Sequence, residues 1–315
     1  MPVREAVVLA AGLGLRMRPL TLETPKPALP FLNRPLLQWI LAGLEEAGVQ
    51  RAFVNLHHLP QAVRDAAGRP ARLQLRFSHE PQILGTAGVF APLRGLLKGP
   101  CFLVANGDTF QAPDYAALEA ELLRYPDCLA VLALRPGGPR YTGVELSQEG
   151  RITGFGRGDV MFAGAYAART ELLEHLPGEG PRDLVPDLLR PLLPSGSIRG
   201  LITSGPWEDL GEPRSYLDAS LRYVQEAAAG RFPVPDESTV ETRDGWPVLR
   251  HASAWLSRDA TVLGPVVLGP RVRVEERAHL GRVLLLPGAA VGRQERLEGA
   301  IRTSTLTVSL PPLDS

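Results

Sequence analysis

The sequence lacks the features of several large classes of protein. Lysine is nearly absent: of the 34 basic residues, 32 are arginine, and the two lysines are Lys26 and Lys98. Formal net charge is zero, so no bulk attraction to nucleic acid or to a membrane surface is expected. No apolar run approaches the ~18 residues of a membrane span, and the N-terminus has no signal-peptide pattern. We therefore expect a cytoplasmic protein without nucleic-acid or membrane partners.

Cysteine is also scarce. Cys101 and Cys128 are the only two, and both lie in apolar, strand-like runs. This placement favours buried thiols over a disulfide or a metal site. The chain has 315 residues, of which 44% are hydrophobic, and this length is typical of two domains that each bury a core.

A glycine-containing turn follows the first apolar run of the chain. The run Val7-Val8-Leu9 is typical of a strand that is buried on both faces. Gly12 and Gly14 lack the Cβ atoms that would keep a ligand from the backbone N–H groups. Arg16 adds a guanidinium, and Lys26 between two prolines adds a compact ammonium. The pattern predicts an anion cradle at the carboxyl end of a first strand, where open α/β sheets bind ligands.

Strands and helices alternate after this turn. Residues 34–44, 61–67 and 86–97 are expected to be helices, and residues 51–56, 73–77 and 99–109 strands. This order predicts an α/β domain with a mostly parallel central sheet. The last of these strands ends in Asn-Gly-Asp, which brings Asp108 to the same edge as the glycine turn. A carboxylate there is a natural ligand for Mg²⁺.

The composition changes at about residue 232 to a linker-like segment, and a six-residue period follows it. Apolar residues recur in one phase at Leu256, Val262, Leu268, Val274, Leu280 and Leu286. A second apolar phase lies two residues before the first, at Ala254, Ala260, Val266, Val272, Ala278, Leu284 and Ala290. This period predicts a left-handed parallel β-helix. The predicted domains are therefore residues 1–231 and residues 232–315.

The N-terminal segment resembles the opening signature of the sugar-1-phosphate nucleotidyltransferases. The resemblance is carried by Leu9-Ala10-Ala11-Gly12-Leu13-Gly14-Leu15-Arg16-Met17-Arg18-Pro19-Leu20-Thr21 and by Pro25-Lys26-Pro27. It implies a Rossmann-like domain of the GT-A type, with Arg16 and Lys26 as catalytic residues. It also implies that Leu9, Ala10, Ala11, Gly12 and Gly14 bind the nucleotide. The segment Trp207-Glu208-Asp209-Leu210-Gly211 resembles the end of these domains, so Asp108 and Asp209 are the implied ligands of Mg²⁺.

Two further segments resemble the base and sugar sites of the family. Residues 80–88 are similar to its base-recognition loop, in which Gly85 and Thr86 contact the base, and the Glu80 carboxylate suits paired donors of guanine. Residues 139–155 resemble its sugar-side hairpin, with Gly143 at the sugar, and residues 161–166 resemble a strand that brings Gly164 there. Most relatives continue with Glu-Lys-Pro, whereas this chain has Gly156-Arg157-Gly158. Arg157 is the candidate replacement for the lysine that binds the sugar phosphate.

We expect an NTP and a sugar-1-phosphate to yield an NDP-sugar and pyrophosphate, most specifically from GTP and mannose-1-phosphate. Glucose-1-phosphate or N-acetylmuramate-1-phosphate with another NTP, and a non-catalytic regulatory or assembly subunit, are the alternatives. A dinucleotide-binding dehydrogenase is disfavoured because the third glycine of its fingerprint is missing. An acyltransferase site on the β-helix is disfavoured because only His251 and His279 could supply a base there. We expect the β-helix to mediate homo-oligomerisation, with the exposed face and the oligomeric state left open.

Overall fold

The computed structural model describes residues 3–310, which divide by packing into two compact units. The first unit contains residues 3–13 and 37–208, and the second contains residues 14–36 and 209–310. This division does not fall at the predicted boundary of residues 231 and 232, because the loop at 14–36 and the helix after residue 212 belong with the C-terminal strands. The two domains predicted over residues 1–231 and 232–315 remain a prediction.

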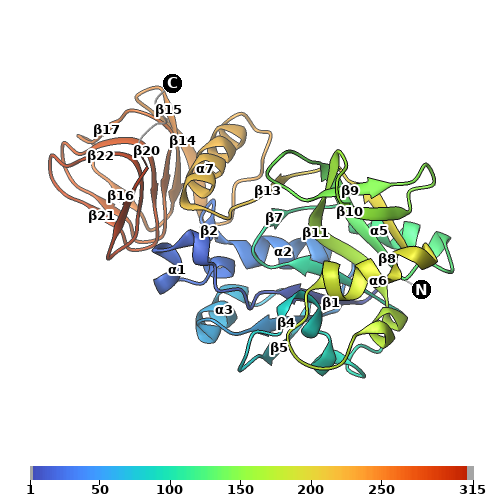
Figure 1. Cartoon of the computed structure of the whole chain (residues 1–315). Helices are drawn as coiled ribbons and strands as arrows, with labels where there is room; N and C mark the ends of the chain where they lie inside the picture. Colours follow the sequence, from blue (N-terminus) through green and yellow to red (C-terminus); the bar gives the residue numbers. More distant parts are fainter. Residues whose placement is uncertain (1–2, 311–315) are drawn as a thin grey trace. The chain divides into compact units, whose positions relative to one another are not determined.

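The first unit is built from short strands and helices (Figure 1). Its strands are β1 (Glu5–Leu9), β4 (Arg51–Leu56), β5 (Gln74–His79), β6 (Cys101–Asn106), β7 (Phe110–Gln111), β8 (Ala130–Pro136), β9 (Gly143–Leu146), β10 (Ile152–Gly156), β11 (Val160–Arg169), β12 (Ile198–Ile202) and β13 (Trp207–Glu208). Its helices are α2 (Leu36–Glu46, of which Leu36 belongs to the second unit), α3 (Pro60–Ala67), α4 (Gly85–Gly88), α5 (Tyr115–Arg124) and α6 (Arg190–Leu192).

The central sheet is mixed, and most of its strands run in one direction, as the sequence predicted, with β10 and β11 opposite to the others. Its strand order is β10-β9-β11-β6-β1-β4-β5, and β8 pairs with β11 and with β12. The strands β6, β1, β4 and β5 run parallel as predicted. The long strand β11 pairs antiparallel with β6, β8 and β9, because the chain returns through the β9–β10 hairpin before entering it.

The prediction of one continuous helix over residues 86–97 is wrong. The structure has the short helix α4 and a 3₁₀ turn at Ala91–Leu93. Pro92 lies within that turn and has no N–H to continue an α-helical ladder. The other predicted helices of this unit are observed as α2 and α3, within a few residues of their expected ends.

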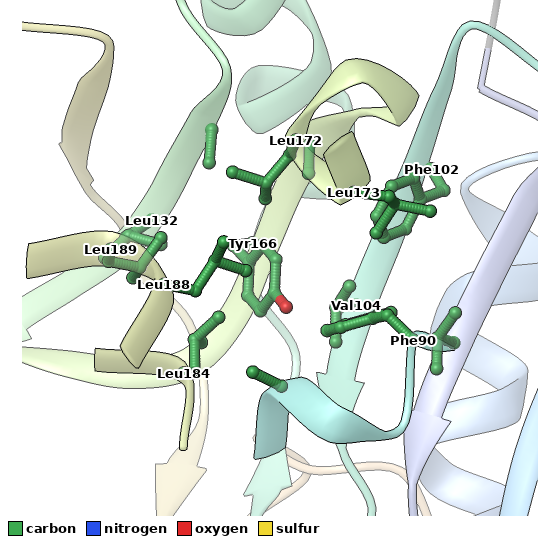
Figure 2. Close-up of a cluster of buried hydrophobic side chains, with 14 of the residues drawn as sticks. Phe90, Phe102, Val104, Leu132, Tyr166, Leu172, Leu173, Leu184, Leu188 and Leu189 are labelled. Carbon is green, nitrogen blue, oxygen red and sulfur yellow. The ribbon is translucent and has the colours of Figure 1, made fainter. Parts of the chain in front are cut away.

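A continuous apolar core lies beside β6, β8 and β11 (Figure 2). Phe102, Leu132 and Tyr166 come from these three strands and are fully buried. The irregular helical segment Leu184–Leu189 adds Leu184 and Leu188 to the same core. This packing fixes the segment that precedes Leu184, which the candidate site uses below.

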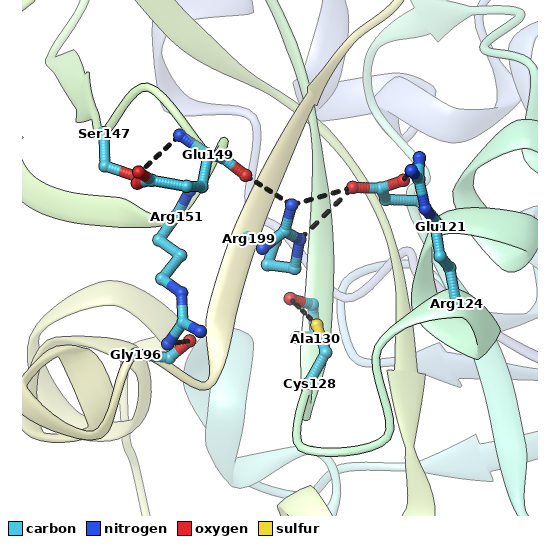
Figure 3. A network of polar contacts seen from close by, with 9 residues as sticks. All are labelled: Glu121, Arg124, Cys128, Ala130, Ser147, Glu149, Arg151, Gly196 and Arg199. Carbon is cyan, nitrogen blue, oxygen red and sulfur yellow. Dashed lines mark hydrogen bonds and ion pairs between the residues drawn. The ribbon is translucent and has the colours of Figure 1, made fainter.

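A buried arginine holds the β9–β10 hairpin (Figure 3). Arg199 on β12 is buried, and its guanidinium donates to the Glu121 carboxylate at 3.1 and 3.2 Å and to the backbone oxygen of Glu149 in the hairpin turn. It also lies 3.5 Å from the ring centroid of Tyr125. One side chain thus joins β12, α5 and the hairpin, and this bonding offsets the cost of burying its charge.

The second unit consists of the loop 14–36, one long helix and the C-terminal strands. Its helices are α1 (Leu20–Glu23) and α7 (Pro213–Ala228), and its strands are β2 (Pro30–Phe31), β3 (Arg34–Pro35), β14 (Ser238–Arg243), β15 (Trp246–His251), β16 (Trp255–Leu256), β17 (Thr261–Val262), β18 (Val266–Leu268), β19 (Arg273–Val274), β20 (His279–Leu285), β21 (Ala290–Val291), β22 (Arg296–Arg302) and β23 (Thr307–Ser309). Within residues 3–310, no helix combines the length and apolar character needed to cross a bilayer.

Strands β15 to β22 form parallel ladders with a nearly constant spacing, while β14 and β23 pair antiparallel at the two ends. Val248 pairs with Val266, and Trp255 pairs with Arg273. In both pairs the partner lies three six-residue repeats further along the chain, which is the length that one coil of the predicted β-helix requires. The ladders therefore agree with the predicted period, while the left-handed β-helix itself remains a prediction.

The apolar phase shifts by one residue in the ladder between β18 and β20. Val266 pairs with Val283, which lies one position short of three full repeats. As a result Val283 and Leu285 join the inner apolar cluster, whereas the repeat had predicted Leu284 and Leu286 there. The shift also exposes Ala290, which the repeat placed inside.

Helix α7 covers the other face of these strands. Val267 lies between Val266 and Leu268, which face the inner cluster, so its side chain faces outward on β18. It is nevertheless buried, and it stands in one row with Leu249, Leu284 and Ile301, all of which are buried. Since α7 packs against β15, β18 and β20, this apolar row is the surface on which the helix lies.

Candidate functional site

In the first unit, the predicted phosphate loop begins beside the strand end that carries Asp108. The strands β1, β4, β5 and β6 are parallel, so their carboxyl ends share one edge of the sheet. Leu9 stands opposite Asn106, and the N–H of Gly107 donates to the Leu9 carbonyl at 2.8 Å. A Cβ on Gly107 would lie 2.8 Å from that carbonyl oxygen, so glycine is required there. The structure thus places the half-buried Asp108 next to the start of the loop.

The backbone of this loop is open at one residue. Ala10 and Ala11 are buried, whereas a Cβ on Gly12 would meet no atom within 4 Å. Gly12 is therefore a point at which a ligand has room to approach the peptide groups of the loop. Phosphate oxygens are the ligands that such exposed N–H groups favour.

The continuation of the loop belongs to the second unit and folds back on itself. The carbonyl of Gly14 accepts from the Thr21 hydroxyl at 2.8 Å and from the Met17 N–H at 2.9 Å. Gly14 has φ of +60°, and a Cβ there would lie 2.9 Å from Cγ2 of Thr21. Both facts explain a glycine at this position without any ligand. The turn that follows, Leu15–Met17, presents the exposed side chain of Arg16.

Arg16 and Asp209 flank the same glycine of the second unit. A Cβ on Gly211 would lie 2.7 Å from Oδ1 of Asp209 and 2.9 Å from Nη2 of Arg16. Two of the predicted site residues, which are far apart in the sequence, are thus brought together. Glycine at position 211 leaves room for both charged groups.

Lys26 is buried, which is unusual for a lysine. It belongs to a 3₁₀ turn, Lys26–Ala28, and the residue is only 5% exposed. Pro25 and Pro27 restrict the backbone on either side of it. A Cβ on Gly14 would lie 3.5 Å from the Cβ of Lys26, so the lysine side chain starts beside the glycine turn. This placement suits the compact ammonium that the sequence predicted at the cradle.

The predicted base loop is held by a segment from much later in the chain. The backbone oxygen of Arg182 accepts from the N–H groups of Ala87 at 2.9 Å and Gly88 at 3.2 Å, and the Thr86 hydroxyl accepts from the Leu184 N–H at 2.8 Å. Gly85 has φ of +76°, and a Cβ there would lie 2.4 Å from the Arg182 oxygen. The packing of the chain therefore explains Gly85, and the predicted contacts of Gly85 and Thr86 with a base remain predictions.

Glu80 is buried and its carboxylate already has protein partners. Oε1 accepts from Nδ2 of Asn55 at 2.8 Å, and Oε2 accepts from the Leu84 N–H at 3.0 Å. The same Asn55 accepts from the Ala10 N–H through Oδ1 at 2.6 Å. Glu80 directly follows β5, and its side chain is turned into the interior of the protein. Its predicted contact with guanine remains untested.

The two predicted sugar-side glycines are also explained by chain packing. A Cβ on Gly143 would lie 2.6 Å from the carbonyl carbon of Arg157 and the carbonyl oxygen of Gly158. A Cβ on Gly164, which has φ of +90°, would lie 2.7 Å from Nδ2 of Asn106. The Arg157 side chain is exposed. Gly143 and Gly164 are therefore needed for the fold, whether or not a sugar contacts them.

A pocket of about 290 Å³ lies at the same hairpin. Its lining is mainly apolar and comes from Tyr141, Thr142, Val144, Phe155, Met161, Phe162 and Val185. Met161 and Phe162 belong to the strand that the sequence expected at a sugar site. This is a concave surface with few charges, as small-molecule sites commonly have.

The two predicted magnesium ligands, Asp108 and Asp209, are carboxylates, a ligand type that Mg²⁺ accepts. Within residues 3–310, no three or more histidine, cysteine, aspartate or glutamate side chains are grouped so that they could hold a metal ion. Mg²⁺ commonly takes one or two carboxylates and completes its shell with water and substrate phosphates. Asp108 and Asp209 are both half-buried and supply oxygen ligands of this kind. They belong to different units, and their joint binding of one ion remains a prediction.

Sequence reasoning missed two parts of this site. Asn55 is a polar residue inside a strand that is otherwise buried, and that pattern could have revealed it. The backbone of Arg182 had no comparable signal, because a carbonyl oxygen is present at every residue. Both lie against loops that the sequence did identify.

The chain is similar to known nucleotidyltransferases along nearly its whole length. The nucleotidyl transferase family model matches residues 5–226. The mannose-1-phosphate guanylyltransferase of Mycobacterium tuberculosis is 28% identical over 94% of this chain and 79% of its own length. The N-acetylmuramate alpha-1-phosphate uridylyltransferase of Caulobacter vibrioides is 32% identical over 70% of this chain and 97% of its own length.

Solved structures show the same fold. HddC from Yersinia pseudotuberculosis, in a crystal structure with GMP-PN, superposes with a TM-score of 0.60 at 22% identity, covering 70% of this chain and all of that one. At this identity the likeness concerns the fold alone. Together with the family model, the relatives and the phosphate-loop geometry, it leads to one conclusion: the chain belongs to the sugar-1-phosphate nucleotidyltransferase family and is a nucleotidyltransferase.

Proposed function

We propose that this protein joins an NTP to a sugar-1-phosphate and releases pyrophosphate, with GTP and mannose-1-phosphate as its substrates. The proposal rests on the edge of the sheet where the Gly107 N–H donates a hydrogen bond to the Leu9 carbonyl. There the open backbone at Gly12 and the carboxylate of Asp108 serve the same triphosphate. Support for the specific pair comes from the guanylyltransferase relatives, whose similarity extends over 94% of the chain.

The reaction needs positioning and charge neutralisation rather than a general base. The attacking oxygen belongs to the sugar phosphate, which is already anionic near pH 7. A bond forms between this oxygen and the α-phosphorus of the NTP, and the bond from that phosphorus to the β-phosphate bridging oxygen breaks. The electron pair leaves with pyrophosphate, and no proton has to move. Catalysis of such a transfer consists mainly of alignment and electrostatic stabilisation.

Each charged residue then has a distinct role. Backbone N–H groups near Gly12 hold phosphate oxygens, and the guanidinium of Arg16 holds the leaving β- and γ-phosphates. The buried ammonium of Lys26 stabilises the charge that develops at the α-phosphate. Asp108 and Asp209 would hold Mg²⁺, which when bound neutralises phosphate charge.

Release of pyrophosphate tests the proposal directly. Four NTPs are combined with mannose-1-phosphate, glucose-1-phosphate and N-acetylmuramate-1-phosphate, and GTP with mannose-1-phosphate is expected to turn over fastest. Asp108→Asn and Lys26→Ala are each expected to lower kcat by roughly 10²–10³ because each removes a contact to the reacting phosphates. Circular dichroism should show unchanged secondary structure in both variants.

Two matched controls exist in the chain. Lys98→Ala removes the only other lysine, which is exposed, and Asp114→Asn changes a carboxylate that caps α5. Both should retain wild-type turnover, since asparagine also serves as an N-cap. Near-normal turnover of Asp108→Asn or Lys26→Ala would contradict the assigned roles. Wild-type protein that is inactive with every pair would support the non-catalytic subunit.

A second substrate pair is favoured by one departure from the family pattern. The exposed Arg157 stands where most relatives have the lysine of Glu-Lys-Pro, and an apolar pocket of about 290 Å³ lies at the same hairpin. The relatives that use N-acetylmuramate phosphate include one that is 32% identical to this chain. Faster turnover of UTP with N-acetylmuramate-1-phosphate would establish this alternative.

We also infer that the C-terminal strands form a left-handed β-helix that joins copies of this chain. The spacing of paired strands by three repeats, or by one position less, supports the coil. Trp255 is 44% exposed on β16, and Arg273 of the neighbouring strand lies 5.0 Å from the centre of its ring. Light scattering should give the mass of a dimer or larger, and a monomer at micromolar concentration would exclude this role.

A further inference from the structure

A buried chain of hydrogen bonds links the phosphate loop to the base loop within the first unit. It begins at the Ala10 N–H, passes through the Asn55 side chain and the Glu80 carboxylate, and ends at the Leu84 N–H. The three bonds are 2.6, 2.8 and 3.0 Å long. Asn55 and Glu80 are only 4% and 2% exposed. This series of hydrogen bonds therefore crosses the carboxyl ends of β1, β4 and β5 beneath the surface.

Each polar group in this series of hydrogen bonds has a fixed role as donor or acceptor. The Asn55 carboxamide accepts with Oδ1 and donates with Nδ2, so its orientation is fixed by its two partners. Both Glu80 oxygens accept, which a carboxylate provides and a carboxamide does not. The backbone of Glu80 is held as well, because its N–H donates to Leu56 at 2.8 Å and its carbonyl lies 2.8 Å from Nδ1 of His57.

We propose that Asn55 and Glu80 are positioning residues that set the spacing between the phosphate loop and the base loop. The proposal rests on the function proposed above for what the two loops bind. It differs from the expectation that Glu80 reads guanine, because a buried carboxylate with two internal donors has no oxygen directed to solvent.

The test exchanges the two functional groups. Asn55→Asp places a carboxylate oxygen against Oε1 of Glu80, and Glu80→Gln places an N–H₂ group against the donor of Asn55 or of Leu84. In the double variant, the new carboxamide at position 80 would donate through Nε2 to the new carboxylate at position 55. Its Oε1 would accept from the Leu84 N–H, and the new carboxylate would accept from the Ala10 N–H. The original direction of every bond except the middle one is kept, and the middle bond is reversed.

We expect each single variant to lower kcat/KM for all four NTPs by a common factor of roughly 10 to 100, because each leaves buried groups unsatisfied. The double variant should return to within about threefold of wild type, with an unchanged order of NTP preference. If Glu80 reads the base, Glu80→Gln will change the preference between GTP and the other NTPs. The double variant will then fail to restore it, because the carboxylate has moved to position 55. That outcome would overturn the proposal.

A second measurement separates this proposal from the proposed function. Amide hydrogen exchange at Ala10 and Leu84 should be faster in both single variants and slow again in the double variant, whether or not the protein turns over any substrate. Unchanged exchange in the single variants would contradict the hydrogen-bond chain. If a single variant does not fold, a double variant that folds with the wild-type Tm supports the pairing, and one that does not fold contradicts it. Gln74→Glu, at the exposed start of β5, is the control for an added carboxylate.

Discussion

The first unit and the C-terminal strands use polar side chains in opposite ways. In the first unit, charged and amide groups such as Arg199, Glu80 and Asn55 are buried and joined by directed hydrogen bonds. In the C-terminal strands, the inner cluster is apolar and several ion pairs lie on the surface, as between Arg296 and Glu298. A repeated coil needs only stacked apolar residues inside it, whereas loops at strand ends need fixed partners. Buried polar bonding therefore marks the part of the molecule that orients a site.

The largest expected effect tests the buried polar network. Arg199→Ala leaves the Glu121 carboxylate without its partner at 3.1 Å and removes a side chain that lies over Tyr125. Loss of one member of a buried ion pair is expected to lower the free energy of unfolding by about 3–5 kcal/mol. Urea unfolding followed by tryptophan fluorescence measures the change.

The control for this variant is Ile202→Ala, because Ile202 is exposed on the same strand. Substitutions at exposed positions usually change the free energy of unfolding by less than about 0.5 kcal/mol. An equally small change in Arg199→Ala would contradict a structural role for the buried arginine.

An intermediate effect concerns pH and belongs to the first unit, which contains both cysteines. Burial raises the pKa of the Cys128 thiol from 9.0 to about 11. Below pH 9 the thiol is protonated in both the folded and the unfolded state, so its contribution to the free energy of unfolding is fully present. Between pH 9 and 11 only the unfolded chain loses the proton, and stability falls as pH rises.

The Cys128→Ala variant isolates this contribution. Other groups that titrate at high pH are shared by both proteins, so the difference between their stability profiles belongs to the thiol. Wild-type stability should fall more steeply than that of the variant between pH 9 and 11, measured by urea unfolding at fixed ionic strength. Parallel profiles would show that Cys128 ionises equally in both states.

The smallest effect is expected from a surface ion pair of the C-terminal strands. Arg296 and Glu298 are 3.1 Å apart, but both side chains are more than half exposed. Arg296→Ala should change the free energy of unfolding by less than about 0.5 kcal/mol, because water screens such pairs. A loss comparable to that of Arg199→Ala would remove the distinction between the first unit and the C-terminal strands.

Much of the site could be predicted from local sequence. Gly12 and Asp108 each follow an apolar strand, and parallel strands bring such ends to one edge. The partners of these residues could not be foreseen. Gly85, for example, is explained by a carbonyl from a distant part of the chain, at Arg182. A glycine signals close approach, but the sequence does not say whether a ligand or the chain itself approaches.

The repeat shows the same limit in the second unit. Its period predicted parallel strands spaced by three repeats, because alternating apolar residues must stack in successive coils. The loss of one position at Val283 moved the inner phase, and only the pairing of strands reveals it. Leu284 remained buried because helix α7 covers the other face.

Local sequence patterns were enough to predict the family, the glycine turn with its charged residues, the strands that end beside it and the spacing of the C-terminal strands. These are local patterns, and local sterics and side-chain alternation are enough to express them. Tertiary structure alone decided that the sheet is mixed, that Glu80 faces Asn55, and that Arg182 holds the base loop. The physical reason is that hydrogen bonds between distant segments depend on which chains meet in space, and no residue records its partner in advance.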